Sequence, residues 1–158
     1  MVTFMRSELL PPEVDDHLVE LMANACTRLE LGGSPTEVAG WLAAESGYDV
    51  DAEWLHGVFG AVDPAETSCA LQVAAEPALL CRVRPTRDEL VEIVERLMPT
   101  SPNWDAGAAP WWAALLDAHV PHPAALNLIF YPPSDVDPAT WDAEAIVEHA
   151  LAYRPIAL

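Results

Sequence analysis

Two prolines confine the stretch from His122 to Pro132 to a very short helix. Pro123 fits only the first turn of a helix, and Pro132 disfavours helical backbone in the residue before it. The large apolar side chains between them are Leu126, Leu128, Ile129, Phe130 and Tyr131. They cannot all face inward on barely two helical turns, so we expect part of this aromatic area to be exposed. The alternative is that Phe130 and Tyr131 are ordinary core residues.

The composition is that of a folded protein with an ordinary core. The chain has 158 residues, of which 52% are apolar, enough for one domain or two small helical modules. No run approaches the roughly 18 apolar residues of a membrane span, and the N-terminus lacks the apolar stretch of a signal peptide. Cys26, Cys69 and Cys81 are not closely spaced, which favours reduced thiols. We therefore expect a soluble cytoplasmic protein.

Acidic residues dominate the charge of the chain. There are 25 of them against seven arginines and no lysine, which gives a formal net charge of −18 at pH 7. Such a charge repels nucleic acid, so DNA or RNA binding is disfavoured. It favours a basic protein partner, because opposite charges speed encounter. Solubility alone is the simpler explanation, since acidic surfaces are common.

Helix-start signals divide the first half of the chain into four short helices. Apolar residues fall at three- and four-residue steps along residues 18–29, and a second helix is expected to end near Gly47. Pro77 interrupts the fourth helix, and residues 78–83 could form a helical turn or a short extended piece. No internal repeat is convincing. The residues that begin or cap these helices are Pro12, Ser34, Pro35, Asp51 and Asp63.

The second half shows the same kind of pattern after a joint at residues 82–85. Thr86 and Glu89 form a capping box, Pro110 suits the start of the next helix, and Asp142 can cap the last. We therefore predict two modules, residues 1–83 and 84–158. No two-residue alternation is long enough for a confident strand, so the predicted fold class is all-α.

Catalytic and metal-binding patterns are weak in this chain. His119 and His122 are close in sequence, but Pro121 between them should break the helix that would align them on a metal. No nucleophile–base signature and no glycine-rich phosphate loop is present. Residues 34–59 have the length of a helix-turn-helix, yet residues 35–58 contain no arginine or lysine to face phosphates. The sequence predicts neither an enzyme nor a cofactor.

The sequence of residues 122–132 and that of the C-terminal residues 150–158 resemble those of the immunity proteins of nuclease colicins and pyocins. The likeness runs from Thr86 to the C-terminus. It implies a four-helix module whose third helix is a single short turn with an Asp-Leu-Ile-Tyr-Tyr-Pro signature. It also implies a function, which is to bind and silence a toxin nuclease beside its active site and so block the path of its substrate.

The resemblance assigns the partner-binding residues. The shared contact on the third helix falls to Asn127, Phe130 and Tyr131, and the specificity contacts of the second helix would lie around Trp111, Trp112 and Asp117. We expect one of these two tryptophans to be core and the other exposed, because neighbouring residues point about 100° apart on a helix.

Three departures from the family pattern bear on the partner. Asn127 replaces the aspartate of the signature, so a charge-assisted hydrogen bond to a basic toxin residue would become a neutral one. Phe130 keeps the ring of the first tyrosine but loses its hydroxyl, and Asp117 is the only acid of a helix that is usually acid-rich in the family. The alternative function is an acidic adaptor or regulatory protein that holds another protein through its N-terminal helices.

Overall fold

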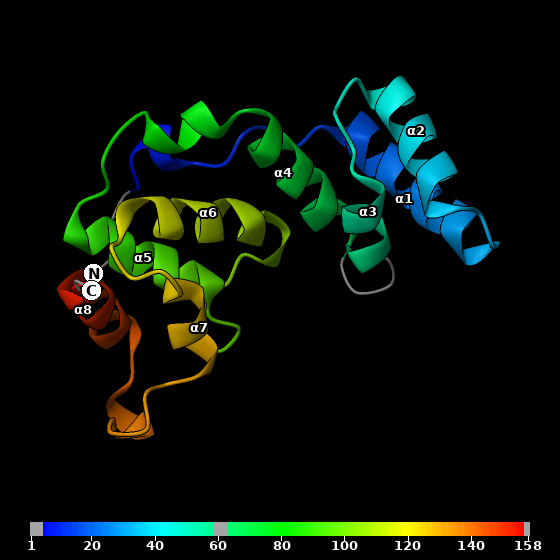
Figure 1. Ribbon diagram of the computed structural model, residues 1–158. Coiled ribbons are helices and arrows are strands. Elements are labelled where there is room, and N and C mark those ends of the chain that lie inside the picture. Colours follow the sequence, from blue (N-terminus) through cyan, green and yellow to red (C-terminus); the bar gives the residue numbers. More distant parts are fainter. Residues whose placement is uncertain (1–4, 59–62, 157–158) are drawn as a thin grey trace. The chain divides into compact units, whose positions relative to one another are not determined.

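The computed structural model describes residues 5–58 and 63–156, and within these ranges every regular element is a helix. This confirms the all-α prediction. The helices pack as two units (Figure 1). The N-terminal unit is Pro12–Pro77, and the C-terminal unit is formed by the chain from Ala78 onward together with the residues up to Pro11. No helix of the described residues is long and apolar enough to cross a membrane.

The N-terminal unit contains helices α1 (Asp16–Glu30), α2 (Pro35–Ser46), α3 (Ala52–Val58) and α4 (Pro64–Ala75). Their ends follow local signals. Asp15, Asp51 and Asp63 each accept a hydrogen bond from a backbone N–H in the first turn that follows, at 2.7–3.1 Å. Gly47 ends α2 with a φ of 77°, a conformation that costs glycine little.

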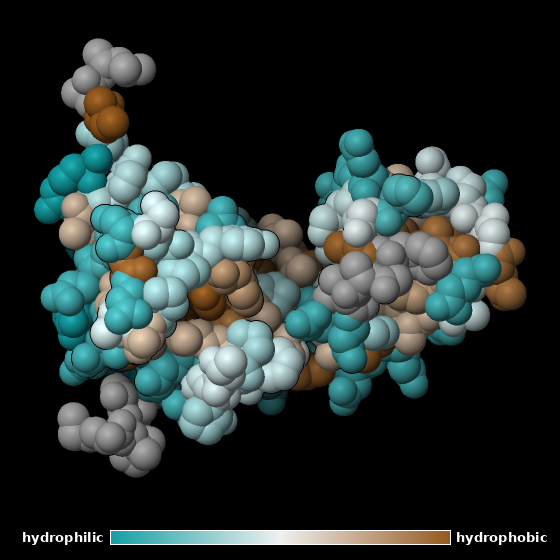
Figure 2. Space-filling model, turned by 90° about the horizontal axis from the view of Figure 1, so that it is seen from below, coloured by the Kyte–Doolittle hydropathy of each residue, from teal (hydrophilic) through white to brown (hydrophobic). Residues whose placement is uncertain are grey.

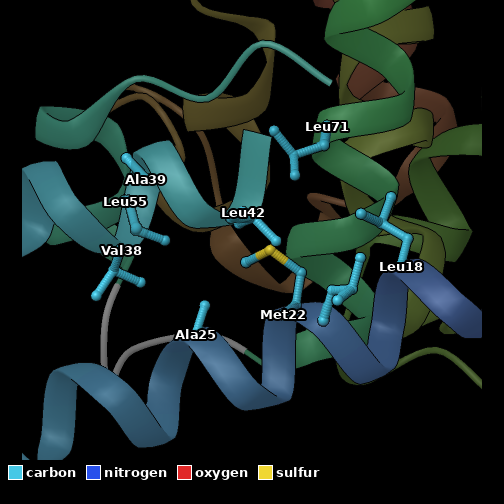
Figure 3. Packing of buried hydrophobic residues seen from close by; sticks show 9 residues of the cluster. Leu18, Met22, Ala25, Val38, Ala39, Leu42, Leu55 and Leu71 are labelled. Carbon is cyan, nitrogen blue, oxygen red and sulfur yellow. The ribbon is translucent and has the colours of Figure 1, made fainter. Parts of the chain in front are cut away.

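The core of the N-terminal unit lies between α1 and α2 and is closed by α3 and α4 (Figure 3). Met22 of α1 and Leu42 of α2 are fully buried in its centre. Leu55 and Leu71 reach the same cluster from α3 and α4. Apolar burial of this kind is the main favourable term in folding the unit.

The C-terminal unit holds the other four α-helices and four short 3-10 turns. The α-helices are α5 (Arg87–Leu97), α6 (Ala109–His119), α7 (Ala125–Phe130) and α8 (Ala143–Ala152). The 3-10 turns are η1 (Ser7–Leu9), η2 (Pro77–Cys81), η3 (Ala106–Ala108) and η4 (Pro138–Thr140). Helix α5 packs against α6 and α8, and α7 packs against the same two helices. The ambiguity at residues 78–83 is thus resolved as a helical turn.

The predicted capping box at the start of α5 is confirmed in both directions. The Thr86 hydroxyl accepts from the Glu89 backbone N–H at 3.2 Å, and the Glu89 carboxylate accepts from the Thr86 backbone N–H at 2.7 Å. The same carboxylate accepts two hydrogen bonds from the guanidinium of Arg6, at 2.7 and 2.8 Å. The buried Glu89 carboxylate is therefore hydrogen-bonded both to the N-cap residue Thr86 and to Arg6, which is far away in the sequence.

The first residues of the described chain pack on the C-terminal unit rather than on the helices that follow them. Leu9 is buried, and its carbonyl oxygen accepts a hydrogen bond from the indole of Trp111 at 2.8 Å. Together with the Arg6–Glu89 pair, this contact explains why the residues up to Pro11 group with those after Ala78. The predicted division at residue 84 grouped this segment with the first module, because tertiary contacts of this kind leave no local signal.

Leu42→Ala should destabilise the N-terminal unit by about 2–5 kcal/mol, because truncation leaves a cavity at a fully buried position. Urea unfolding followed by circular dichroism measures the change. Leu31→Ala is the matched control, since Leu31 is 84% exposed and its truncation should change the free energy of unfolding by no more than about 0.5 kcal/mol. Equal losses for the two variants would contradict this description of the core.

Glu89→Gln should lower the stability of the C-terminal unit by about 1–3 kcal/mol at pH 7, because it weakens hydrogen bonds that now end on a buried carboxylate. Asp88→Asn removes a charge from the neighbouring, exposed position of the same helix turn and serves as the control. Urea unfolding at pH 7 distinguishes the two variants, and a larger loss for Asp88→Asn would contradict the role given to Glu89.

The difference in unfolding free energy between the wild-type protein and Glu89→Gln should itself depend on pH. The hydrogen bond from Arg6 holds the pKa of the Glu89 carboxyl below its ordinary value, although burial opposes this shift. A lowered carboxyl pKa contributes stability above the unfolded-state value, about 4.3, and that contribution is lost as the pH falls below it. The gap between the two unfolding free energies should therefore narrow below about pH 4.3. A constant gap from pH 7 to pH 3 would contradict this linkage.

Candidate partner-binding surface

Helix α7 has one face inside and one face outside the C-terminal unit. Ala125 and Leu128 are buried, at a spacing that places them on the same side of the helix. Asn127 is exposed on the other side, and Phe130 and Tyr131 are 51% and 75% exposed. The three residues assigned to the third helix by family resemblance therefore lie at the surface of the unit.

The exposed residues stand on a firmly held backbone. The Tyr131 N–H donates to the Asn127 carbonyl at 2.8 Å, which closes the last turn of α7. The indole of Trp141 donates to the Leu128 carbonyl at 2.6 Å. At the start of the helix, the Ala124 N–H donates to Nδ1 of His122 at 3.0 Å. Backbone groups at both ends of this short helix thus have partners, which restrains the aromatic pair that it carries.

Rings from α8 and its flanking segments continue this support. His122 lies against Tyr153, with 4.9 Å between ring centroids. Trp141 meets His149 edge to face at 5.6 Å. Edge-to-face and tilted contacts at these distances are favourable for aromatic rings. The segments before and after α7 are therefore both joined to α8 and its extension.

The expectation that Trp111 or Trp112 is exposed was wrong. Both side chains are fully buried. The indole of Trp111 is covered by the N-terminal segment, to which it donates its hydrogen bond, and the indole of Trp112 donates to the carboxylate of Asp105 at 3.1 Å. The guanidinium of Arg96 lies over the Trp112 ring, 4.8 Å from its centroid. Two sides of α6 are enclosed, so neither tryptophan is presented to a partner.

Asp117 is the acid that α6 does expose. No described residue gives its carboxylate a hydrogen bond or an ion pair, and partial burial raises the pKa of this carboxyl above its ordinary value. An exposed carboxylate without a partner in the protein can accept a hydrogen bond from an incoming basic group. Asp117 therefore remains a candidate contact, whereas the tryptophans of the same helix do not.

Trp104 is a surface aromatic that sequence reasoning missed. It is 50% exposed in the connection between α5 and α6. This connection is ordered by hydrogen bonds, from the Trp104 N–H to the Ser101 carbonyl at 3.1 Å and from the Asp105 N–H to the Arg96 carbonyl at 3.0 Å. The available signal was a tryptophan within a polar loop rich in proline, where no helical face could bury it.

The histidines do not gather into a metal site in the part of the chain that the structure describes. No group of three or more histidine, cysteine or acidic side chains could hold an ion there. His119 instead donates from Nε2 to the carbonyl oxygen of Leu80 at 2.6 Å, which ties η2 to the end of α6.

Comparisons with known proteins identify the unit that carries this surface. Residues 85–155 match the family model described as colicin immunity protein / pyocin immunity protein. No curated protein matches the chain, and no solved structure does. The matched residues include the whole of α5 to α8, and so include the exposed residues of α7. Residues 85–155, somewhat less than half of the chain, are thus similar to the colicin and pyocin immunity proteins.

Proposed function

We propose that this protein is an immunity protein that binds a cognate bacterial toxin, a nuclease, and inhibits it by blocking the path of its substrate. The observation that carries the proposal is the exposure of Phe130 and Tyr131 on a short, firmly held helix within a unit similar to the immunity proteins. The protein performs no chemistry in this role. It acts by occupying the surface that the toxin needs for its nucleic acid.

The chemistry of the pair suits a protein contact. Aromatic rings bury much area while losing few rotatable bonds, so they dominate the binding energy of many interfaces. Tyr131 combines a ring with a hydroxyl that can hydrogen-bond to the partner, and it is the more exposed of the two. Phe130 is half-buried and contributes through its ring alone. We assign the anchor to Tyr131 and give Asn127 a neutral hydrogen bond beside it.

Charge supports a basic nuclease as the partner. The net charge of −18 opposes contact with nucleic acid and favours a protein surface that itself holds phosphates. Hydrophilic side chains project from both units on the face seen in Figure 2. A bound acidic protein would repel the substrate as well as obstruct it, so bulk and charge act in the same direction.

Tyr131→Ala should cost about 2 kcal/mol or more of toxin binding and leave folding nearly intact, because the side chain is exposed in the unbound protein. Calorimetric titration with the purified nuclease domain of a toxin, sought first among the genes adjacent to this one, measures the loss, and a nuclease assay should show weaker inhibition. Val14→Ala is the control, since Val14 is a well-exposed apolar residue of the other unit.

Two results would contradict the assignment. Wild-type affinity in Tyr131→Ala would remove α7 from the interface. No binding of the wild-type protein to the neighbouring toxin would reject the proposed function itself.

A further inference from the structure

The two units contain the same series of helices. In each, two longer helices are followed by a short third helix and a longer fourth, α1 to α4 in one unit and α5 to α8 in the other. Helix α1 packs against α2 and α4, as α5 packs against α6 and α8, and α2 packs against α3 as α6 does against α7. These shared helix pairs, in the same order along the chain, suggest that the two units have the same arrangement of helices.

The buried positions of the first helices fall in the same register. In both α1 and α5, the four buried residues are separated by steps of three, one and three residues, so the inward faces of the two helices match position by position. The equivalent residues are Leu18, Leu21, Met22 and Ala25 in α1, and Leu90, Ile93, Val94 and Leu97 in α5.

The second and third helices match without any insertion. Helix α2 ends at Ser46 and α3 begins at Ala52, while α6 ends at His119 and α7 begins at Ala125, so the connections have equal length. In this register the four buried residues of α2 and α3 have buried counterparts in α6 and α7, where Leu116 and Ala125 are buried in addition. The matched residues are Val38, Ala39, Leu42 and Leu55 in the N-terminal unit, and Trp111, Trp112, Leu115 and Leu128 in the C-terminal unit.

The fourth helices agree when their caps are aligned. Asp63 and Asp142 are the N-cap residues of α4 and α8, and each accepts from a backbone N–H of the first turn. Counted from the cap, the same three positions are buried in both helices. They are Thr67, Ser68 and Leu71 in α4, and Ile146, Val147 and Ala150 in α8. The loop before α8, which contains η4, is longer than the loop before α4. This difference in loop length changes the residue offset between the third helices and the fourth helices of the two units.

A contact of the same kind joins the first and second helices of each unit, although its residues do not coincide in the shared register. Arg28, in the last turn of α1, lies over the ring of Trp41 in α2, 4.0 Å from its centroid. Arg96, in the last turn of α5, lies over the ring of Trp112 in α6 at 4.8 Å. A cation–π contact between the first and second helices thus occurs in both units.

We infer that residues 12–77 are a second, diverged copy of the four-helix module of residues 85–155, and we propose that the outer face of α2 and α3 is a second contact surface for the same toxin. The choice of partner rests on the proposed function, whereas the equivalence of the units does not. Helices α2 and α3 are the counterparts of α6 and α7, which carry Asp117 and the exposed residues Asn127, Phe130 and Tyr131.

The second surface has a different chemistry from the first. In the shared register, Gly57 and Val58 of α3 stand where α7 has Phe130 and Tyr131, so the aromatic pair is missing. The exposed side chains of α2 and α3 include Glu37, Glu45 and Glu53, and none of them has a hydrogen bond or ion pair to a described residue.

Charge complementarity defines what this face can bind. Apart from two histidines, Arg28 is the only basic residue of Pro12–Pro77, and its cation already lies on Trp41. The face therefore suits a basic protein surface, such as the one on which a nuclease holds its substrate.

The test neutralises the face in the full-length protein and measures toxin binding at several salt concentrations. In the triple variant Glu37→Gln, Glu45→Gln, Glu53→Gln, the Kd for the purified nuclease domain should rise about tenfold at low salt, and its salt dependence should become shallower. The control variant Glu13→Gln, Glu20→Gln, Glu76→Gln removes the same charge from exposed positions of the same unit outside α2 and α3. Its Kd should stay within about twofold of wild type.

Equal effects of the two triple variants, or no effect of either, would overturn the second surface. Hydrogen exchange gives an independent reading, because toxin binding should slow exchange in residues 35–58 of the wild-type protein, and unchanged rates there would also overturn it. Failure of this second surface can be distinguished from failure of the proposed α7 contact. Loss of binding in Tyr131→Ala with no effect of the first triple variant leaves that contact in place and rejects this surface alone.

Discussion

Prolines on both sides of α7 limit it to six residues, and a helix of that length can bury only one narrow face. Ala125 and Leu128 occupy that face, so the apolar residues that follow have no place in the core. The surrounding segments compensate through the indole of Trp141 and the ring of His122, which hold the helix at its two ends. The exposed apolar surface of α7 thus follows from a limit on helix length.

Such a surface is available without rearrangement. Side chains that are already restrained lose less entropy when a partner arrives, so more of the contact energy appears as affinity. An aromatic pair left exposed in the free protein costs solubility, and the strong negative charge of the chain counteracts association between copies. The two properties are therefore compatible in one protein, and together they fit the basic partner that we propose.

Helix boundaries were predictable from the sequence because their causes are local. Thr86 caps α5 and Asp142 caps α8 through residues only three positions away, and Gly47 ends α2 through its own backbone freedom. The exposure of α7 residues followed in the same way from its flanking prolines.

The environment of Trp111 could not be predicted by such reasoning. Its burial depends on Leu9, which lies on a segment about a hundred residues earlier in the chain. Periodicity states which residues share a helix face, but it does not state how many faces of that helix are covered. The same limit applies to the pairing of Arg6 with Glu89, which joins positions 83 residues apart in the sequence.

The likeness of the two units escaped sequence reasoning for a different reason. A core position needs an apolar side chain whose volume fits its own neighbours, and it does not need a particular residue. Ala39 and Trp112 occupy equivalent positions with very different volumes, so each unit has been packed anew around the same backbone pattern. Identity between the copies is lost under these conditions, whereas the order of buried and exposed positions is kept.

The path of the chain gives the N-terminal unit an unusual attachment. Because the residues up to Pro11 belong to the C-terminal unit, residues 12–77 leave that unit at one point and return to it at another. The N-terminal unit is therefore an insertion fastened by two covalent connections, and each has proline beside the joint, at Pro11–Pro12 and at Pro77. A protease would have to cut both connections to release it.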